Sequence, residues 1–173
     1  MMLKEIVDRR SCRKFDKTKE VKKEDLDKVI AAGLLAPSGM NKQEGIVICI
    51  TNKEKRDALS RINKGGGSWP PGDPFYDAPV ILLVAVKKSF LADDDGAVMI
   101  QNMLLEATHL GLACCWIHRA KEELENPEFR ELFKETGLNY DEYQGVGHVA
   151  LGYNDGYVPG PKVIKDNRVF YIK

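Results

Sequence analysis

The segment from Arg9 to Phe15 carries the residue types best suited to hold a compact anion. It reads Arg9-Arg10-Ser11-Cys12-Arg13-Lys14-Phe15, which places four cations and a hydroxyl behind a short apolar stretch. The whole chain has 26 basic and 26 acidic residues, so its formal net charge is zero. In a neutral protein such a cluster is either a solvated corner or an anion site, and the planar fork of arginine grips phosphate oxygens two at a time. The segment alone leaves both interpretations open.

The cysteines and histidines lack the spacing of a metal site or a nucleophilic triad. Cys114 and Cys115 are adjacent in an apolar run, so on a strand their side chains point to opposite faces and make a poor chelate. There is no Cys-x-x-Cys pair, and no paired carboxylates stand out. We therefore expect no metal, reduced thiols packed in the core and a cytoplasmic protein. His148, between Gly147 and Val149, is expected to be a hydrogen-bonded core histidine.

Length and composition indicate one domain, covering residues 1–173, with a substantial core. Balanced charge argues against binding to nucleic acid or to a membrane surface. No apolar run is long enough to span a bilayer, and the first residues lack the apolar core of a signal peptide. The loops lack Gly-x-Gly-x-x-Gly and Gly-x-x-x-x-Gly-Lys, so neither a Rossmann dinucleotide site nor a nucleotide triphosphate loop is predicted.

Apolar spacing predicts helices that alternate with strands. The predicted helices lie at 3–7, 24–36, about 52–62, 94–110 and 127–136, and the predicted strands at 46–50, 80–86, 112–117 and 146–151. The run 80–86 is wholly apolar, so it should be a central strand buried on both faces. Start signals are a capping box at Thr51 and Glu54, Asp93 or Asp94 as a cap, and Asn126-Pro127-Glu128.

Two irregular segments interrupt this alternation. Residues 63–79 contain three consecutive glycines and four prolines beside Trp69, Phe75 and Tyr76. This loop either lines or covers a cleft or is a plain surface connection. The tail 154–167 has no regular period and leads to an apolar strand at 168–172. We infer from this pattern that the tail crosses to a second subunit.

Four separated motifs resemble those of the nitroreductase family of flavoproteins, in particular its short members. They cover nearly the whole chain in the family's order, which gives the resemblance its specificity. The motifs are Arg9–Phe15, Ala36-Pro37-Ser38-Gly39-Met40-Asn41-Lys42-Gln43, Asp95 through Gly111-Leu112 into Cys115-Trp116-Ile117, and Gly147-His148-Val149-Ala150-Leu151-Gly152-Tyr153. The resemblance implies an α+β fold with a mostly antiparallel sheet surrounded by helices. It also implies an intertwined homodimer with C-terminal arm exchange and flavin mononucleotide (FMN) sites at the subunit interface.

The same resemblance assigns roles at the two ends of the chain. Arg9, Arg10 and Ser11 would bind the FMN phosphate, and Arg13 would lie near the pyrimidine edge of the ring, where a cation stabilises the charge of the reduced form. A cation from the tail would join the same phosphate. Lys165 is the best match for it, with Arg168 as a helper and Lys162 as a substitute. The family usually has Arg-Lys where this chain has Ile164-Lys165.

Two further motifs would contact the flavin ring. Pro37, Ser38, Gly39 and Asn41 resemble a loop that reaches the flavin from the other subunit; without the resemblance they read as an ordinary helix-ending turn. The family commonly continues Gln-Pro-Trp, whereas here Gln43 is followed by Glu44-Gly45. Trp116, Ile117 and His118 would lie beside the reactive edge, where a backbone amide donates to the ring nitrogen that accepts hydride.

The implied function is that of an FMN-dependent oxidoreductase with a ping-pong mechanism. NADH or NADPH reduces the flavin and leaves, and a small acceptor such as a nitroaromatic or a quinone then takes the electrons in the same cleft. No cation cluster for a 2′-phosphate stands apart from the flavin cations, which favours NADH. The alternatives are a different reaction on the same site (reductive dehalogenation, ene reduction or flavin breakdown), a flavin-binding module without activity, or a basic cluster that binds no ligand.

Overall fold

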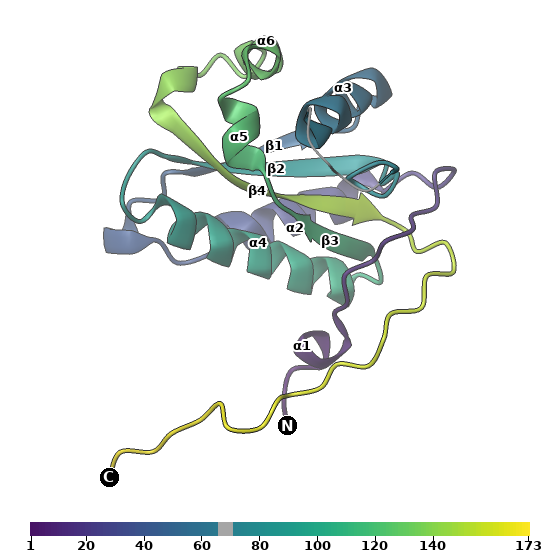
Figure 1. Cartoon of the computed structure of the whole chain (residues 1–173), viewed down its shortest axis with the longest axis vertical. Helices are drawn as coiled ribbons and strands as arrows, with labels where there is room; N and C mark the ends of the chain where they lie inside the picture. The colour runs from purple at the N-terminus through teal and green to yellow at the C-terminus, as the bar shows by residue number, and fades with distance from the viewer. Residues whose placement is uncertain (66–70) are drawn as a thin grey trace.

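A four-stranded antiparallel sheet forms the centre of the molecule (Figure 1). We describe residues 1–65 and 71–173 of a computed structural model. The strands are β1 (Gly45–Ile50), β2 (Val80–Lys87), β3 (Ala113–Ile117) and β4 (Tyr143–Gly152), and their order across the sheet is β1-β2-β4-β3. The expected α+β architecture with an antiparallel sheet is therefore confirmed, and β4 begins three residues before its predicted start.

Strand β2 is the most buried element. Every residue from Val80 to Val86 is buried, and β2 pairs with β1 on one side and with β4 on the other. Because both faces of this strand are apolar, only a position with helices above and below removes all of its side chains from water. The central position predicted for residues 80–86 is confirmed.

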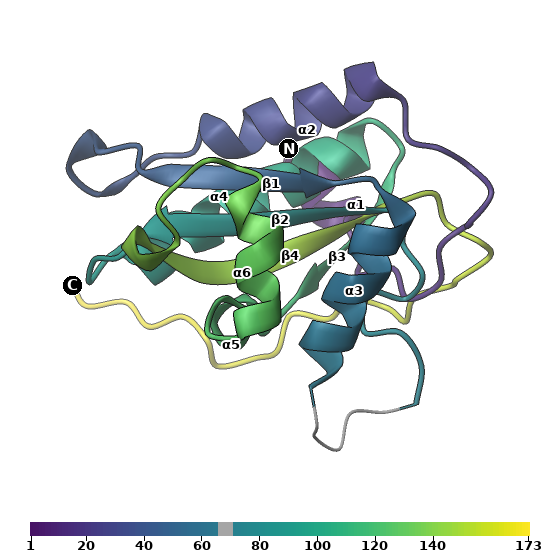
Figure 2. The ribbon, with the colours of Figure 1, turned by 90° about the horizontal axis from the view of Figure 1, so that it is seen from above.

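Helices cover both faces of the sheet (Figures 1 and 2). One face carries α2 (Lys23–Leu34) and α4 (Ala92–His109), with the short α1 (Lys4–Asp8) beside α4. The other face carries α3 (Lys53–Lys64), α5 (Ala120–Leu124) and α6 (Pro127–Lys134). Within the described residues, no helix combines the length and the apolar character needed to cross a bilayer.

The adjacent cysteines of β3 belong to different cores. Cys114 packs in the cluster under α2 and α4, whereas Cys115 packs in the cluster under α3 and α6. Side chains alternate between the faces of a strand, so neighbouring residues are separated by the sheet. The predicted core role of the two thiols is confirmed.

The two edges of the sheet differ. Along β3, Ser11 forms a parallel bridge with Cys114, and the amide of Cys12 donates to the Cys114 carbonyl at 2.9 Å. The amide of Asp16 then donates to the Tyr153 carbonyl at 2.8 Å, just past β4. The N-terminal segment thus covers the β3 edge. Strand β1 has β2 as its one strand neighbour in the described chain.

The C-terminal arm leaves the body of the protein. After Pro159 every residue is exposed, and Figure 1 shows the arm running past α1 and away from the sheet. Lys162 donates to the carbonyl of Ile6 at 3.3 Å. The strand predicted at 168–172 is not formed within the single chain, because strand hydrogen bonds need a neighbour. Its four apolar side chains, Val169 to Ile172, are 68 to 102% exposed.

Two of the predicted helix starts differ from the observed ones. Asn52 caps α3 by accepting from the Lys55 amide, so the capping box at Thr51 is not formed. Helix α4 starts after Leu91 without a side-chain cap, and Asp93 and Asp94 lie in its first turn. There their charges still oppose the positive end of the helix dipole.

The start of α6 is confirmed, since Asn126 accepts from the Glu128 amide. Helix α5 was not predicted. Asn63 and Lys64 end α3, so the long loop begins two residues later than expected. Trp69, which was expected to line or cover a cleft, lies outside the described residues. Phe75, in contrast, is fully buried.

Candidate functional site

The basic cluster lies along the β3 edge. Because Ser11 bridges to Cys114, the residues just before it pass beside the start of β3. Arg9, Arg10 and Ser11 are half-buried and Arg13 is exposed. Half-buried guanidinium groups are well placed to hold an anion, since they keep part of their donors free and are less screened than fully solvated ones.

Two of these arginines already have partners in the chain. Arg10 donates to the carbonyls of Val7 and Arg9 at 2.6 and 2.9 Å, so it caps the end of α1. Arg13 donates to the Tyr157 hydroxyl at 2.9 Å. The tail turn that presents Tyr157 is closed by Asn154, whose side chain both accepts from the Tyr157 amide and donates to its carbonyl.

The segment 116–118 ends the same edge strand. Trp116 is 39% exposed, Ile117 is buried and His118 is exposed. From Cys114, beside the basic cluster, to His118 the chain advances roughly 13 Å at the usual strand rise. The basic cluster and residues 116–118 therefore lie at the two ends of the same edge strand.

The carbonyls at the end of β3 point into the protein. The His118 carbonyl accepts from the Asn63 side chain at 3.0 Å, and the Ile117 carbonyl lies 3.4 Å from Nδ1 of His148. His148 is fully buried, and its Nε2 lies 2.7 Å from a carboxylate oxygen of Glu123. The prediction that His148 is a hydrogen-bonded core histidine is confirmed.

The loop from Pro37 to Asn41 lies at the other side of the sheet, before β1. Gly39 to Asn41 form a 3-10 turn in which Met40 and Asn41 both have φ of 53°. The Gly39 amide donates to Asp95 at 2.8 Å, and the Ser38 hydroxyl accepts from the Gln43 amide at 2.9 Å. A Cβ atom at Gly39 would clash with the end of the Leu91 side chain. The structure thus joins the second motif to Asp95, the first residue of the third.

The predicted site is divided between the two edges of the sheet. Residues 9–13 and 116–118 lie at the β3 edge, whereas residues 37–41 lead into β1 at the opposite edge. Lys165 and Arg168 are exposed on the arm. One chain therefore places residues 9–13 and 116–118 at the same edge and the loop 37–41 at the opposite edge.

Burial makes the thiols near the basic cluster unreactive. Burial raises the pKa of Cys114 to about 12. It also raises the pKa of Cys115, although the neighbouring Ser11 and Arg13 act in the opposite direction. Protonated buried thiols are neither nucleophiles nor metal ligands.

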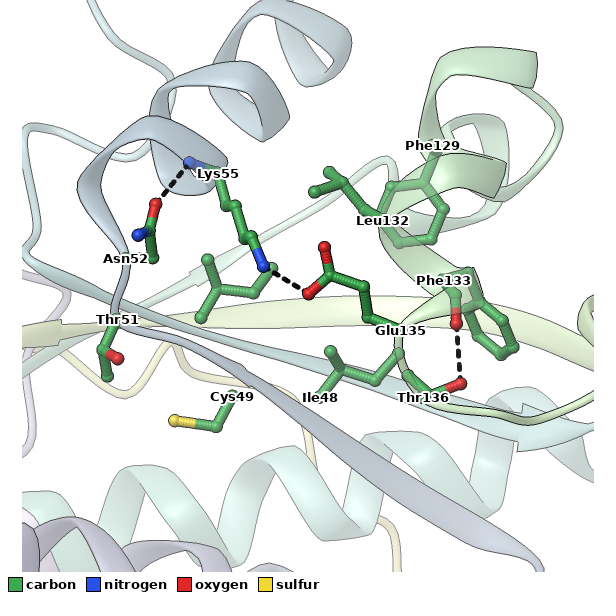
Figure 3. A pocket seen from close by; sticks show the side chains of 11 residues that line it. Ile48, Cys49, Thr51, Asn52, Lys55, Phe129, Leu132, Phe133, Glu135 and Thr136 are labelled. Carbon is green, nitrogen blue, oxygen red and sulfur yellow. Dashed lines mark hydrogen bonds and ion pairs between the residues drawn. The ribbon is translucent and has the colours of Figure 1, made fainter.

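A separate groove of about 270 Å³ lies beside the β1 edge, between β1, α3 and α6 (Figure 3). Ile48 and Leu132 help to form its apolar lining, and an ion pair between Lys55 and Glu135 crosses it. None of the residues predicted for the site lines this groove.

Several polar residues of the site region were not predicted. Tyr157 holds Arg13, Asn63 contacts the His118 carbonyl just past β3, and Glu123 contacts His148 on β4. Asn63 and Glu123 are 0 and 1% exposed. Asn63 falls in the predicted loop 63–79 and Glu123 in no predicted element, and only the glycine of Asn154-Asp155-Gly156-Tyr157 signals the tail turn.

Comparison with known proteins places these features in context. The family model described as "Nitroreductase family" matches residues 6–153. A putative NADH dehydrogenase/NAD(P)H nitroreductase from Methanothermobacter thermautotrophicus is 30% identical over 66% of this chain, which spans 59% of that relative's length.

Two solved structures match over almost the full chain. A nitroreductase with bound FMN from Bacteroides fragilis has a TM-score of 0.89 and 30% identity, over 99% of this chain and 98% of its own. A second nitroreductase with bound FMN, from Desulfitobacterium hafniense, has a TM-score of 0.88 and 27% identity over the whole of both chains.

Proposed function

The chain belongs to the nitroreductase family, and we propose that it is an FMN-dependent oxidoreductase that passes electrons from NADH or NADPH to a small acceptor such as a nitroaromatic or a quinone. The observation that carries the proposal is the alignment of the basic cluster and segment 116–118 along one strand edge. Two structural relatives with bound FMN support the choice of cofactor. The balanced charge of the chain favours a small-molecule substrate over nucleic acid.

The residues present fit FMN by the chemistry of their donors. A phosphate needs cations and a hydroxyl that are shielded from bulk water, and Arg9, Arg10 and Ser11 are half-buried. The opposite end of the ligand needs an aromatic surface and backbone donors; Trp116 is 39% exposed, and the carbonyls of Ile117 and His118 face the protein, which turns the following amides outward. When bound, the flavin supplies the hydride chemistry.

The protein's own groups bind, orient and balance charge. Arg9 and Ser11 neutralise and anchor the phosphate, and Arg13, fixed by Tyr157, places its guanidinium beside the pyrimidine edge. A cation held there before reaction stabilises negative charge that develops on reduction without any reorganisation. No catalytic acid or base of the chain is needed in this scheme.

We propose further that the working form is a homodimer with exchanged C-terminal arms. The division of the site supports this, because a second copy would bring the loop 37–41 to the basic cluster of the first. The β1 edge offers strand hydrogen bonds to the partner's residues 168–172, and the apolar groove beside it offers a place for their side chains. Lys165 of that arm would then be drawn to the phosphate site.

The absorption spectrum of gently purified protein is the first test. We expect flavin bands, and their loss on anaerobic addition of NADH or NADPH in stopped-flow measurements. A panel of acceptors, including halogenated and ene substrates, then identifies the oxidant. A bound flavin that neither nicotinamide reduces would indicate a binding module, and protein that stays colourless after incubation with FMN would overturn the proposal.

Complementation tests the division of the site. One variant carries Arg9→Ala with Arg10→Ala, and the other carries Ser38→Ala with Asn41→Ala. Each alone should bind FMN weakly. After denaturation and co-refolding of an equal mixture, symmetry predicts that about one quarter of the sites regain wild-type affinity, since half of the dimers are mixed and each has one intact site. Refolding that restores no tight sites would contradict a shared site.

A further inference from the structure

Three buried polar side chains meet behind the end of β3. Asn63 comes from the end of α3, Glu123 from α5 and His148 from β4, and their exposed fractions are 0, 1 and 0%. Asn63 donates to one oxygen of Glu123, and the other oxygen lies 2.7 Å from Nε2 of His148. The Phe75 ring packs edge-on against His148 with centroids 5.2 Å apart. We call Asn63, Glu123 and His148 the buried triad.

The contacts fix where the donors of the triad point. The Ile117 carbonyl can only accept, so the 3.4 Å contact is a hydrogen bond only if Nδ1 of His148 carries a proton. One further proton must lie between Nε2 and Glu123, either on the ring or on the carboxyl. In both arrangements the pair is neutral overall, which suits its burial.

Asn63 and His148 both face backbone carbonyls of residues 117–118. His148 faces the Ile117 carbonyl and Asn63 donates to the His118 carbonyl at 3.0 Å. In a trans peptide the carbonyl and the following amide point in opposite directions, and the described chain has no cis peptide. The amides of His118 and Arg119 are therefore turned away from the triad. Arg119 has φ of 79°, a left-handed conformation that bends the chain at this point.

A purely structural role leaves the cost of the triad unexplained. Burying three polar groups is expensive, and apolar residues of similar volume usually pack at least as well. Among the described residues, Oδ1 of Asn63 is buried without a hydrogen-bond partner, which adds to this cost. A requirement for a fixed backbone at residues 117–119 accounts for it.

We propose that Asn63, Glu123 and His148 are positioning residues that aim the amides of His118 and Arg119 at the redox-active edge of the flavin. This inference rests on the proposed function. An amide that donates to the hydride-accepting ring nitrogen favours the oxidised ring, because after reduction that nitrogen carries a hydrogen and becomes a donor itself. Loosening the triad should therefore raise the midpoint potential of the bound flavin.

The chain offers a matched pair of variants for the test. Asn63→Leu removes the bonds to the His118 carbonyl and to Glu123, and the control Asn102→Leu removes a 3.1 Å bond from Asn102 on α4 to the Ala32 carbonyl. Midpoint potentials are measured on the FMN-loaded dimers. For Asn63→Leu we expect about a tenfold change in the ratio of affinities for oxidised and reduced flavin, which is roughly 30 mV for a two-electron couple. For Asn102→Leu we expect no change.

A second variant and a second readout keep the test decisive. Glu123→Gln can still accept from Asn63, so it should fold and raise the potential by a smaller amount. Amide NMR of FMN-free protein should show altered His118 and Arg119 signals in Asn63→Leu and unaltered ones in Asn102→Leu. Absence of FMN binding by the wild type would overturn the proposed function but leave this NMR test intact. Unchanged potentials and unchanged amide signals in both triad variants would overturn the positioning role.

Discussion

The two edges of the sheet differ in whether the described chain covers them. At the β3 edge the N-terminal segment supplies backbone partners and places Arg9, Arg10 and Ser11 next to the strand. At the β1 edge the chain supplies no strand partner within the described residues, although it has an apolar segment of strand length at its end. An open edge normally invites aggregation unless it is covered. One edge is therefore covered within the chain, and the other is left open for the second copy that we propose.

Removing the arm should have the largest effect on this contrast. Deletion of residues 161–173 removes the apolar segment 168–172, which we propose pairs with β1 of the partner. It also removes Lys165 and Arg168. We expect a monomer by light scattering and purification without flavin. The thermal midpoint of the apoprotein should change little relative to that of an isolated wild-type monomer, because every deleted residue is exposed in the chain. A truncated protein that stays dimeric and yellow would show that the arm does not complete the site.

Removing cations from both ends should come next in size. Arg9→Ala combined with Lys165→Ala deletes two proposed phosphate contacts, each worth about 1.5–3 kcal/mol as a hydrogen bond to a charged group, so FMN affinity should fall by roughly 10²–10⁴-fold. Fluorescence quenching of FMN measures it. Lys23→Ala with Lys28→Ala on the exposed face of α2 removes the same charge and serves as the control. Equal affinities in the two double variants would remove the phosphate-site argument.

The labelling rate of Cys49 should report on the covering of the β1 edge, with a smaller effect than the two preceding changes. Cys49 is exposed on β1, whereas Cys114 is buried on β3 with a pKa raised to about 12. We expect iodoacetamide at pH 8 to label Cys49 several-fold faster in the arm-deleted protein than in the wild type, and Cys114 in neither. Timed mass spectrometry follows both sites. If Cys49 reacts at the same rate in both proteins, the partner's arm does not lie along β1.

The contact between Glu5 of α1 and His109 of α4 should have the smallest effect, which is on the local stability of α1. Glu5 and His109 lie 2.8 Å apart, which raises the pKa of His109 and lowers that of Glu5. The contribution of His109 to the stability of the α1–α4 contact is present below its ordinary pKa and is lost as the pH rises through the raised pKa. The contribution of Glu5 is lost as the pH falls through its lowered pKa. Both groups are solvated, so the gain is modest.

Hydrogen exchange in α1, corrected for the intrinsic pH dependence, checks this prediction. Exchange should accelerate as the pH rises through the titration of His109. His109→Gln should remove that step, while leaving the exchange of β2 unchanged. A step that persists in His109→Gln would mean that another group holds α1 in place.

The sequence allowed much of the fold to be predicted, because the strong signals are local. The apolar run 80–86 could only be a doubly covered strand, and Asn126-Pro127 could only start a helix. The weaker start signals at Thr51 and Asp93 were misassigned, because the neighbouring Asn52 caps α3 and because α4 starts without a side-chain cap. The terminal strand at 168–172 was predicted from its own residues, but pairing depends on a partner that the single chain lacks.

The site was less predictable, and the reason is again physical. The motifs identified residues that we expect to face a ligand, and this stays a prediction for Arg9 to Arg13, Pro37 to Asn41, Trp116 to His118 and the tail. Residues that position the backbone without touching the ligand belong to no such motif. Asn63 falls in the predicted loop 63–79 and Glu123 in a charged stretch without a predicted element, and only the fold reveals that Asn63 reaches the His118 carbonyl and that Glu123 reaches His148 on β4. Long-range polar contacts of this kind have no periodicity in sequence.

The position of the arm has a consequence for assembly. All four described strands lie before residue 153, so the sheet can form without the exposed arm that follows it. In the homodimer that we propose, two such bodies would meet already folded and lay their arms across one another without threading. Assembly would then be a second-order process, and its half-time should shorten as the protein concentration rises.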